Sequence, residues 1–84
     1  MVKLTKVVVP WPNGLHLRHA VRLVKTAARF QSTVLLKCGD RIADVRSILS
    51  IVALCATIGT TLEVEISGDD EADAAQTVEQ LFLD

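Results

Sequence analysis

Alternation of polar and apolar residues in three stretches of the chain predicts four β-strands. Residues 2–9, VKLTKVVV, alternate imperfectly but are rich in β-branched side chains and stop at two closely spaced prolines. Residues 32–45, STVLLKCGDRIADV, alternate on both sides of a Gly-Asp turn, which indicates a hairpin of two short strands. Residues 61–67, TLEVEIS, put apolar side chains on one face and glutamates on the other, as a half-buried strand does.

From His16 onward the apolar residues recur at the spacing of a helix. The residues of this broad apolar face are Ala20, Leu23, Val24, Ala27 and Phe30. The opposite face forms what we call the basic ridge, which consists of Arg18, Arg22, Lys25 and Arg29. This division into two faces predicts an amphipathic helix with its basic side toward solvent.

Two further helices are expected. A short, mostly apolar helix should begin at Ser47. The last helix lies within residues 68–84 and opens with acidic residues, which suit the positive end of a helix dipole. The residues expected on its inward face are Ala72, Ala75, Val78, Leu81 and Phe82.

The order of elements is therefore β-α-β-β-α-β-α. Eighty-four residues are too few for helix layers on both faces of a sheet and form one modest core. We therefore expect a single domain over residues 1–84 of the α+β class, in which one four-stranded antiparallel sheet carries three helices on one face.

Charge is divided unevenly along the chain. All nine Lys and Arg residues lie at or before Arg46, and eight of the ten acidic residues lie at or after Glu63. A basic face on the folded molecule would steer acidic or phosphorylated partners toward it. Nucleic acid is not an expected partner, because the overall pI is near 6.1 and only 4% of the residues are aromatic.

A cytoplasmic protein is expected. The uncharged stretch of residues 47–62 is shorter than a membrane span and is interrupted by polar residues, and no signal-type cleavage site follows the first strand. Cys38 and Cys55 match no zinc-site spacing. In a cytoplasmic chain we expect them to be reduced, buried thiols, with a disulfide as the alternative.

Both histidines lie in the segment PNGLHLRHA, where the strand pattern changes to the helix pattern. A helix that begins near His16 has free backbone N–H groups that favour an anion. The imidazole of His16 is a nucleophile able to attack a phosphoryl donor, and the Arg18 guanidinium could neutralise the phosphoryl oxygens. One alternative is an ordinary polar surface histidine. Another is a metal site of His16 with His19, for which the sequence shows no further ligands nearby.

The run from Gly14 to Ala20, Gly-Leu-His-Leu-Arg-His-Ala, resembles the active-site segment of the HPr family, whose usual signature is Gly-Leu-His-x-Arg-Pro-Ala. The resemblance extends over the whole chain. It includes the glycine-centred hairpin, the Arg-Ser-Ile segment at residues 46–48, Gly59 before the last strand, and the acidic opening of the last helix at residues 68–72. The order of elements also agrees with the open-faced β-sandwich of that family.

The resemblance implies a phosphocarrier protein of the bacterial phosphoenolpyruvate-dependent sugar phosphotransferase system. Such a protein accepts a phosphoryl group from phospho-enzyme I on Nδ1 of its histidine, here His16, and passes it to EIIA domains of sugar permeases. Arg18 would stabilise the phosphate. The protein would have no catalytic cycle of its own, no cofactor and no metal, and we expect a monomer. The alternative is a regulatory paralogue that acts by binding proteins, with weak or absent histidine phosphotransfer.

The resemblance also implies a regulatory site. Ser47 occupies the position of the serine that HPr kinase/phosphorylase modifies in part of the family; alternatively, it is simply a helix N-cap. For docking to enzyme I we expect part of the basic ridge together with apolar residues of the second helix. The residues concerned are Arg22, Lys25, Ile48, Leu49 and Val52.

Two residues, His19 and Cys55, depart from the family pattern, and a third, Trp11, is a large aromatic residue beside the site. His19 replaces the proline of the signature and adds a second titratable ring. Cys55 stands where many relatives have a glycine that ends the second helix, so this helix should run longer or end differently. Trp11, between two prolines, is expected to lie exposed in a loop and shield the site or touch partners, with a place in the core as the alternative.

Overall fold

The computed structural model describes residues 2–83, and its seven elements follow the predicted order. They are β1 (Val2–Val8), α1 (Leu17–Ala27), β2 (Thr33–Cys38), β3 (Arg41–Asp44), α2 (Ile48–Val52), β4 (Thr61–Ser67) and α3 (Glu71–Leu81).

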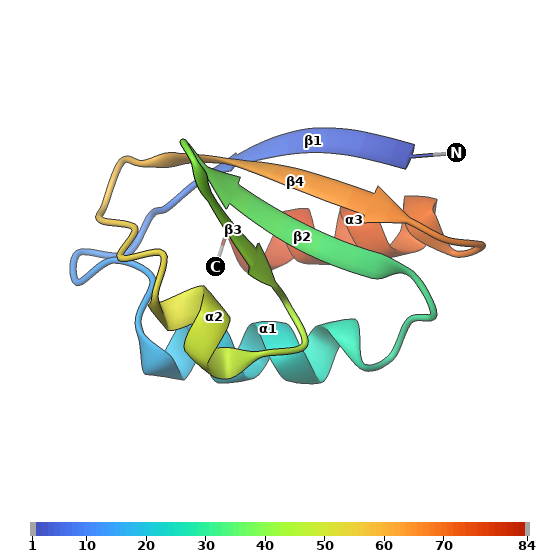
Figure 1. The fold of residues 1–84 in the computed structure, drawn as a ribbon, viewed down its shortest axis with the longest axis horizontal. Coiled ribbons are helices and arrows are strands. Elements are labelled where there is room, and N and C mark those ends of the chain that lie inside the picture. The colour runs from blue at the N-terminus through green and yellow to red at the C-terminus, as the bar shows by residue number, and fades with distance from the viewer. Residues whose placement is uncertain (1, 84) are drawn as a thin grey trace.

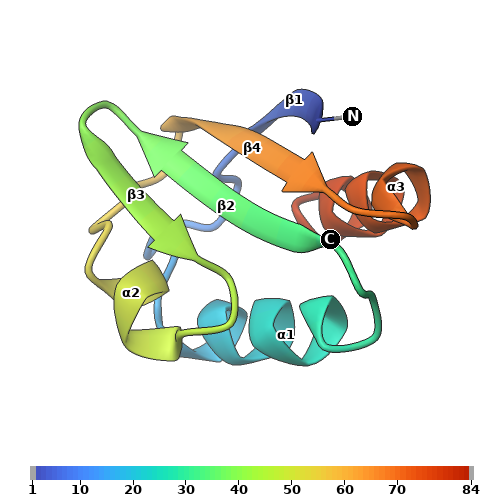
Figure 2. The ribbon, with the colours of Figure 1, turned by 45° about the vertical axis from the view of Figure 1, so that its right-hand side comes forward.

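The four strands form one antiparallel sheet in the order β1-β4-β2-β3. All three helices lie on the same side of this sheet, and its other face is open (Figures 1 and 2). The expected α+β class and open-faced arrangement are confirmed. The loop after β1 leads from the sheet to the helix layer. Helix α1 therefore begins at the end of the molecule where β4 also begins (Figure 1).

The core lies between the sheet and the helices. In β4 the side chains of Leu62, Val64 and Ile66 are completely buried, whereas Glu63 and Glu65 lie on the open face, as the alternation predicts. On that open face Glu65 forms an ion pair with Lys37 of β2. The two-residue period of the strand therefore separates an apolar inner face from a charged outer one.

The inward face of α3 differs from the prediction at one position. Ala75, Val78, Leu81 and Phe82 are buried as expected, but Ala72 is exposed and Ala74 is buried in its place. Ala74 lies four residues before Val78 and so shares its face, whereas Ala72 lies in the first turn on the outer flank.

The two cysteines are free thiols, but the expectation that they are buried was wrong. Cys38 is half-buried and Cys55 is exposed. Helix α2 ends at Val52, and Cys55 then takes a positive φ of 53° in the loop that follows. The helix therefore does not run longer, and a non-glycine residue takes the left-handed conformation near its end.

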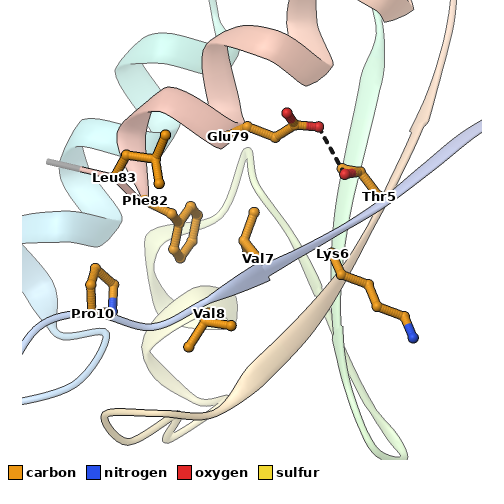
Figure 3. Close-up of a pocket in the computed structure, with 8 residues that line it drawn as sticks. All are labelled: Thr5, Lys6, Val7, Val8, Pro10, Glu79, Phe82 and Leu83. Carbon is orange, nitrogen blue, oxygen red and sulfur yellow. Dashed lines mark hydrogen bonds between the residues drawn. The ribbon is translucent and has the colours of Figure 1, made fainter.

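A pocket of about 410 Å³ lies between the edge strand β1 and the end of α3. Figure 3 shows its largely apolar side chains, with Lys6 extending away from them and the hydroxyl of Thr5 donating a hydrogen bond of 2.8 Å to Glu79. Phe82, which lines this pocket, also packs against the loop that precedes α1. Between residues 2 and 83 we find no helix long and apolar enough to cross a membrane.

Candidate functional site

The loop between β1 and α1 is tied at both ends to the segment before β4. The N–H of Val9 donates to the carbonyl of Thr60 at 2.9 Å, and the N–H of Leu15 donates to the carbonyl of Ala56, also at 2.9 Å. Between them, the N–H of Gly14 donates to the Trp11 carbonyl at 2.8 Å and closes a turn. These bonds fix the direction from which the chain enters α1.

Gly14 is required at this turn. Its φ is +76°, and a Cβ added there would lie 2.5 Å from the carbonyl oxygen of Ala56, the acceptor for Leu15. A side chain would therefore collide with backbone that cannot swing aside, in addition to the strain of the left-handed conformation.

His16 is the N-cap of α1. Its backbone is extended (φ −110°, ψ −173°), and its carbonyl accepts the N–H groups of His19 and Ala20 at 3.0 Å each. Its half-buried side chain accepts no capping hydrogen bond. Leu17 and Arg18 are the first two residues of the helix, so no carbonyl of a preceding helical turn accepts their backbone N–H groups. This end of the helix therefore attracts an anion.

The burial of the His19 ring is the feature of the site that the sequence analysis did not predict. Only 6% of its surface is exposed, and its ring stacks on Trp11 with a centroid distance of 3.7 Å and an interplanar angle of 12°. The His16 and His19 rings meet edge to face, with a centroid distance of 4.4 Å and an interplanar angle of 67°. A signal was present, because His19 precedes the buried Leu23 and Ala27 at intervals of four residues.

Trp11 is buried, with 9% of its surface exposed, so the expected exposed aromatic was wrong. One side of its ring stacks on His19, and the ring also packs against Phe82 at a centroid distance of 5.2 Å. Trp11 thus fills the space between the loop and the end of α3 and belongs to the core that supports the site.

Burial lowers the pKa of His19 from its ordinary value of 6.5, and electrostatic interactions with His16, Arg18 and Arg22 lower it further. The Nδ1 atom of His19 is buried without a hydrogen-bond partner. Protonation would place an N–H there with no acceptor, in a low-dielectric surrounding. The His19 ring is therefore neutral near pH 7.

The four side chains of the basic ridge are exposed as predicted, with Arg18 in the first turn of α1, but the helix ends at Ala27 and Arg29 lies beyond it. Helix α2 packs against α1 and, in both ribbon views, lies beside its N-terminal half (Figures 1 and 2). In α2, Ile48 and Val52 are half-buried and Leu49 is 81% exposed. The structure thus brings an exposed apolar side chain and basic side chains onto two adjoining helices.

Ser47 is the N-cap of α2, which was the structural alternative to a regulatory role for this serine. Its hydroxyl oxygen accepts the N–H of Ser50 at 3.2 Å, and the residue is exposed. The preceding Arg46 forms an ion pair of 2.8 Å with Asp44. Ser47 is therefore exposed to solvent while it stabilises the start of its helix.

Within residues 2–83, no three residues among His, Cys, Asp and Glu gather in a group that could hold a metal ion. His16 and His19 therefore have no third candidate ligand in the described part of the chain. Their nearness is explained by packing, because His19 stacks on Trp11 and the His16 ring meets the His19 ring.

Comparison with known proteins identifies the family of this chain. Residues 4–84 match the family model described as the PTS HPr component phosphorylation site. The chain is 39% identical over 69 residues to phosphocarrier protein HPr of Xylella fastidiosa, which covers 82% of this chain and 78% of the relative. It is 35% identical over 69 residues to phosphocarrier protein HPr of Treponema pallidum, with the same coverage of 82% and 78%.

Solved structures share the fold. The phosphocarrier protein HPr of Bacillus anthracis superposes with a TM-score of 0.89 at 23% identity and covers 96% of each chain. Crh of Bacillus subtilis, whose crystal structure was described as a domain-swapped, intertwined dimer, gives a TM-score of 0.78 at 30% identity over 99% of this chain and 94% of its own. By sequence match and by fold, this chain belongs to the HPr family.

Proposed function

We propose that this protein is a phosphoryl carrier of a sugar phosphotransferase system. It accepts a phosphoryl group on Nδ1 of His16 from phospho-enzyme I and passes it to EIIA domains of sugar permeases. The observation that carries this proposal is the position of His16, at the N-terminus of α1 with a side chain that caps no helix N–H. The protein acts as a substrate of the transfer enzymes, without a catalytic cycle or cofactor of its own.

The transfer is a displacement at phosphorus. The Nδ1 lone pair of His16 forms the new N–P bond while the bond from phosphorus to the donor atom of enzyme I breaks, and the donor keeps that electron pair. The first N–H groups of α1 and the exposed guanidinium of Arg18 can then bind the phosphoryl oxygens. In the second transfer an EIIA domain accepts the phosphoryl group. The N–P bond breaks, its electron pair returns to Nδ1, and His16 is free again.

Intact-mass measurement tests this function. We expect the protein to gain one phosphoryl group when it is incubated with phosphoenolpyruvate and enzyme I, and to lose it again in mild acid, because an N–P bond is acid-labile. A protein that gains no phosphate under these conditions is not a carrier.

The docking surface for enzyme I is proposed to combine Arg22 and Lys25 with the apolar residues of α2: Ile48, Leu49 and Val52. We expect Lys25→Glu to slow association with an acidic enzyme I about tenfold at low salt and to flatten its salt dependence. Lys3→Glu, the same charge change at an exposed lysine of β1, is the matched control and should have little effect. Stopped-flow association rates at two salt concentrations make the comparison, and equal rates for the two variants would exclude the ridge from the interface.

Ser47 is proposed as a regulatory phosphorylation site of HPr kinase/phosphorylase. Because Asp is also a good N-cap, we expect Ser47→Asp to keep or raise the melting temperature while slowing transfer from enzyme I to His16 about tenfold. Ser47→Ala, the control, should lose about 1 kcal/mol of stability by removing the cap and leave transfer intact. Transfer assays and thermal melts measure both; a Ser47→Asp protein that melts lower and transfers normally would make Ser47 a cap only.

The second candidate function is that of a regulatory HPr-like protein that acts by binding other proteins. The observation in its favour is His19, which changes the surroundings of His16 relative to the family signature. A phosphate that is acid-stable and forms only with ATP and HPr kinase/phosphorylase would support this second function. We propose that the protein acts as a monomer in either case, which sedimentation analysis would test.

A further inference from the structure

Four aromatic rings connect the end of α3 to the candidate phosphoryl acceptor. Phe82 packs against Trp11, Trp11 stacks on His19, and His19 meets the ring of His16. The first three rings are at least nine-tenths buried, with 2%, 9% and 6% of their surfaces exposed, whereas His16 is only half-buried. The contacts therefore run from the buried core to the ring of the proposed acceptor.

No capping hydrogen bond orients the His16 ring. Rotation of an imidazole about its second side-chain torsion is broad when nothing packs against it. The edge-to-face contact with His19 at 4.4 Å supplies such packing in a geometry that aromatic rings prefer.

We propose that His19 is a positioning residue, which is clamped against Trp11 and sets the rotation of the His16 ring for phosphoryl transfer. This inference rests on the proposed function of His16 as the acceptor. It gives a role to the residue that replaces the proline of the family signature, because the stacked His19 ring would hold the neighbouring His16 ring in place.

The arrangement requires a flat ring without charge. A positively charged neighbour would repel the developing positive charge on His16 as its lone pair attacks phosphorus. Burial and the nearby Arg18 and Arg22 keep His19 neutral, and its buried Nδ1 has no hydrogen-bond partner to lose. Phenylalanine, which is flat, neutral and without ring nitrogens, should therefore replace His19 in this role.

Three substitutions separate the effect of a flat ring from the effect of filling the space that it occupies. His19→Phe keeps the stack on Trp11, and His19→Ala removes it. His19→Leu fills the same space with a non-planar side chain and serves as the second loss-of-stack variant should the alanine protein not fold. Amide NMR spectra establish that each variant is folded.

The first measurement is the rotational order of the His16 ring, from 13C relaxation of labelled histidine in the unphosphorylated protein. The second is the transfer rate from phospho-enzyme I as the concentration of this protein is varied. We expect His19→Ala and His19→Leu to make the His16 ring more mobile and to lower the maximum rate about tenfold, with the half-saturating concentration unchanged, since a misplaced reacting group slows the chemical step. His19→Phe should match the wild type in both.

Two results would overturn the positioning role: a His16 ring as ordered without the stack as with it, or a ring in His19→Phe as mobile as in His19→Ala. Failure of the proposed function would look different. A wild-type protein that takes no phosphoryl group from enzyme I would refute the carrier, while the relaxation comparison would still decide whether His19 holds the His16 ring.

Discussion

Replacing His16 by alanine is expected to abolish acid-labile phosphorylation while the fold remains intact. The imidazole supplies the only nitrogen nucleophile proposed to take the phosphoryl group, so its loss removes the acceptor and not merely part of the rate. Stability should change by no more than about 1 kcal/mol, because the side chain is half-buried and caps no N–H of α1. Intact mass after incubation with phosphoenolpyruvate and enzyme I, together with a thermal melt, measures both.

His19→Ala is the matched control for this experiment. This substitution removes the other imidazole, three residues away, which is buried against Trp11. The phosphate addition should remain detectable but form more slowly. If the His19 variant loses the label and the His16 variant keeps it, the assignment of His16 as the acceptor is wrong.

Gly14→Ala is expected to destabilise the protein by about 3 kcal/mol, through backbone strain and collision combined. The added Cβ would lie 2.5 Å from the Ala56 carbonyl, in a residue whose φ is +76°. Relief requires the loop to move away from Ala56, which breaks the bond from Leu15 and shifts the start of α1 that carries His16. Urea unfolding measures the stability, and phosphoryl transfer under folding conditions should fall as well.

Gly39→Ala separates strain from collision. Gly39 also has a positive φ, +60°, but a Cβ added there meets nothing within 4 Å. This variant should lose only about 1 kcal/mol and transfer normally. Equal losses of stability in the two alanine variants would show that the close approach to Ala56 does not constrain the loop.

Much of the site could be predicted from local sequence. The change of period at His16 places the start of α1 correctly, because a helix start depends on residues within one or two turns. The N-cap role of Ser47 was foreseen for the same reason, since its acceptor contact is with Ser50, three residues on. The exposed basic ridge follows from helical spacing alone.

The interior of the site could not be predicted in this way. Flanking prolines suggested an exposed loop for Trp11, but its burial depends on Phe82 at the other end of the chain. The sequence marks His19 as a second titratable ring in place of the signature proline, but does not show that this ring is buried between Trp11 and His16. The contact between Trp11 and Phe82 leaves no local pattern, because the two residues lie at opposite ends of the chain, whereas the burial of His19 has a local signal in its four-residue spacing from Leu23 and Ala27.

What the sequence by itself determined is the set of elements, their order and the residue at the start of α1, all of which follow from periods of two and 3.6 residues and from capping and turn chemistry. Only the tertiary structure decided which side chains the core accepts near that start. Packing of α3 against the β1–α1 loop buries Trp11, and Trp11 in turn buries His19 as a neutral ring. The burial of an aromatic or titratable ring depends on what covers it, and here the covering residues come from elements far apart in the chain.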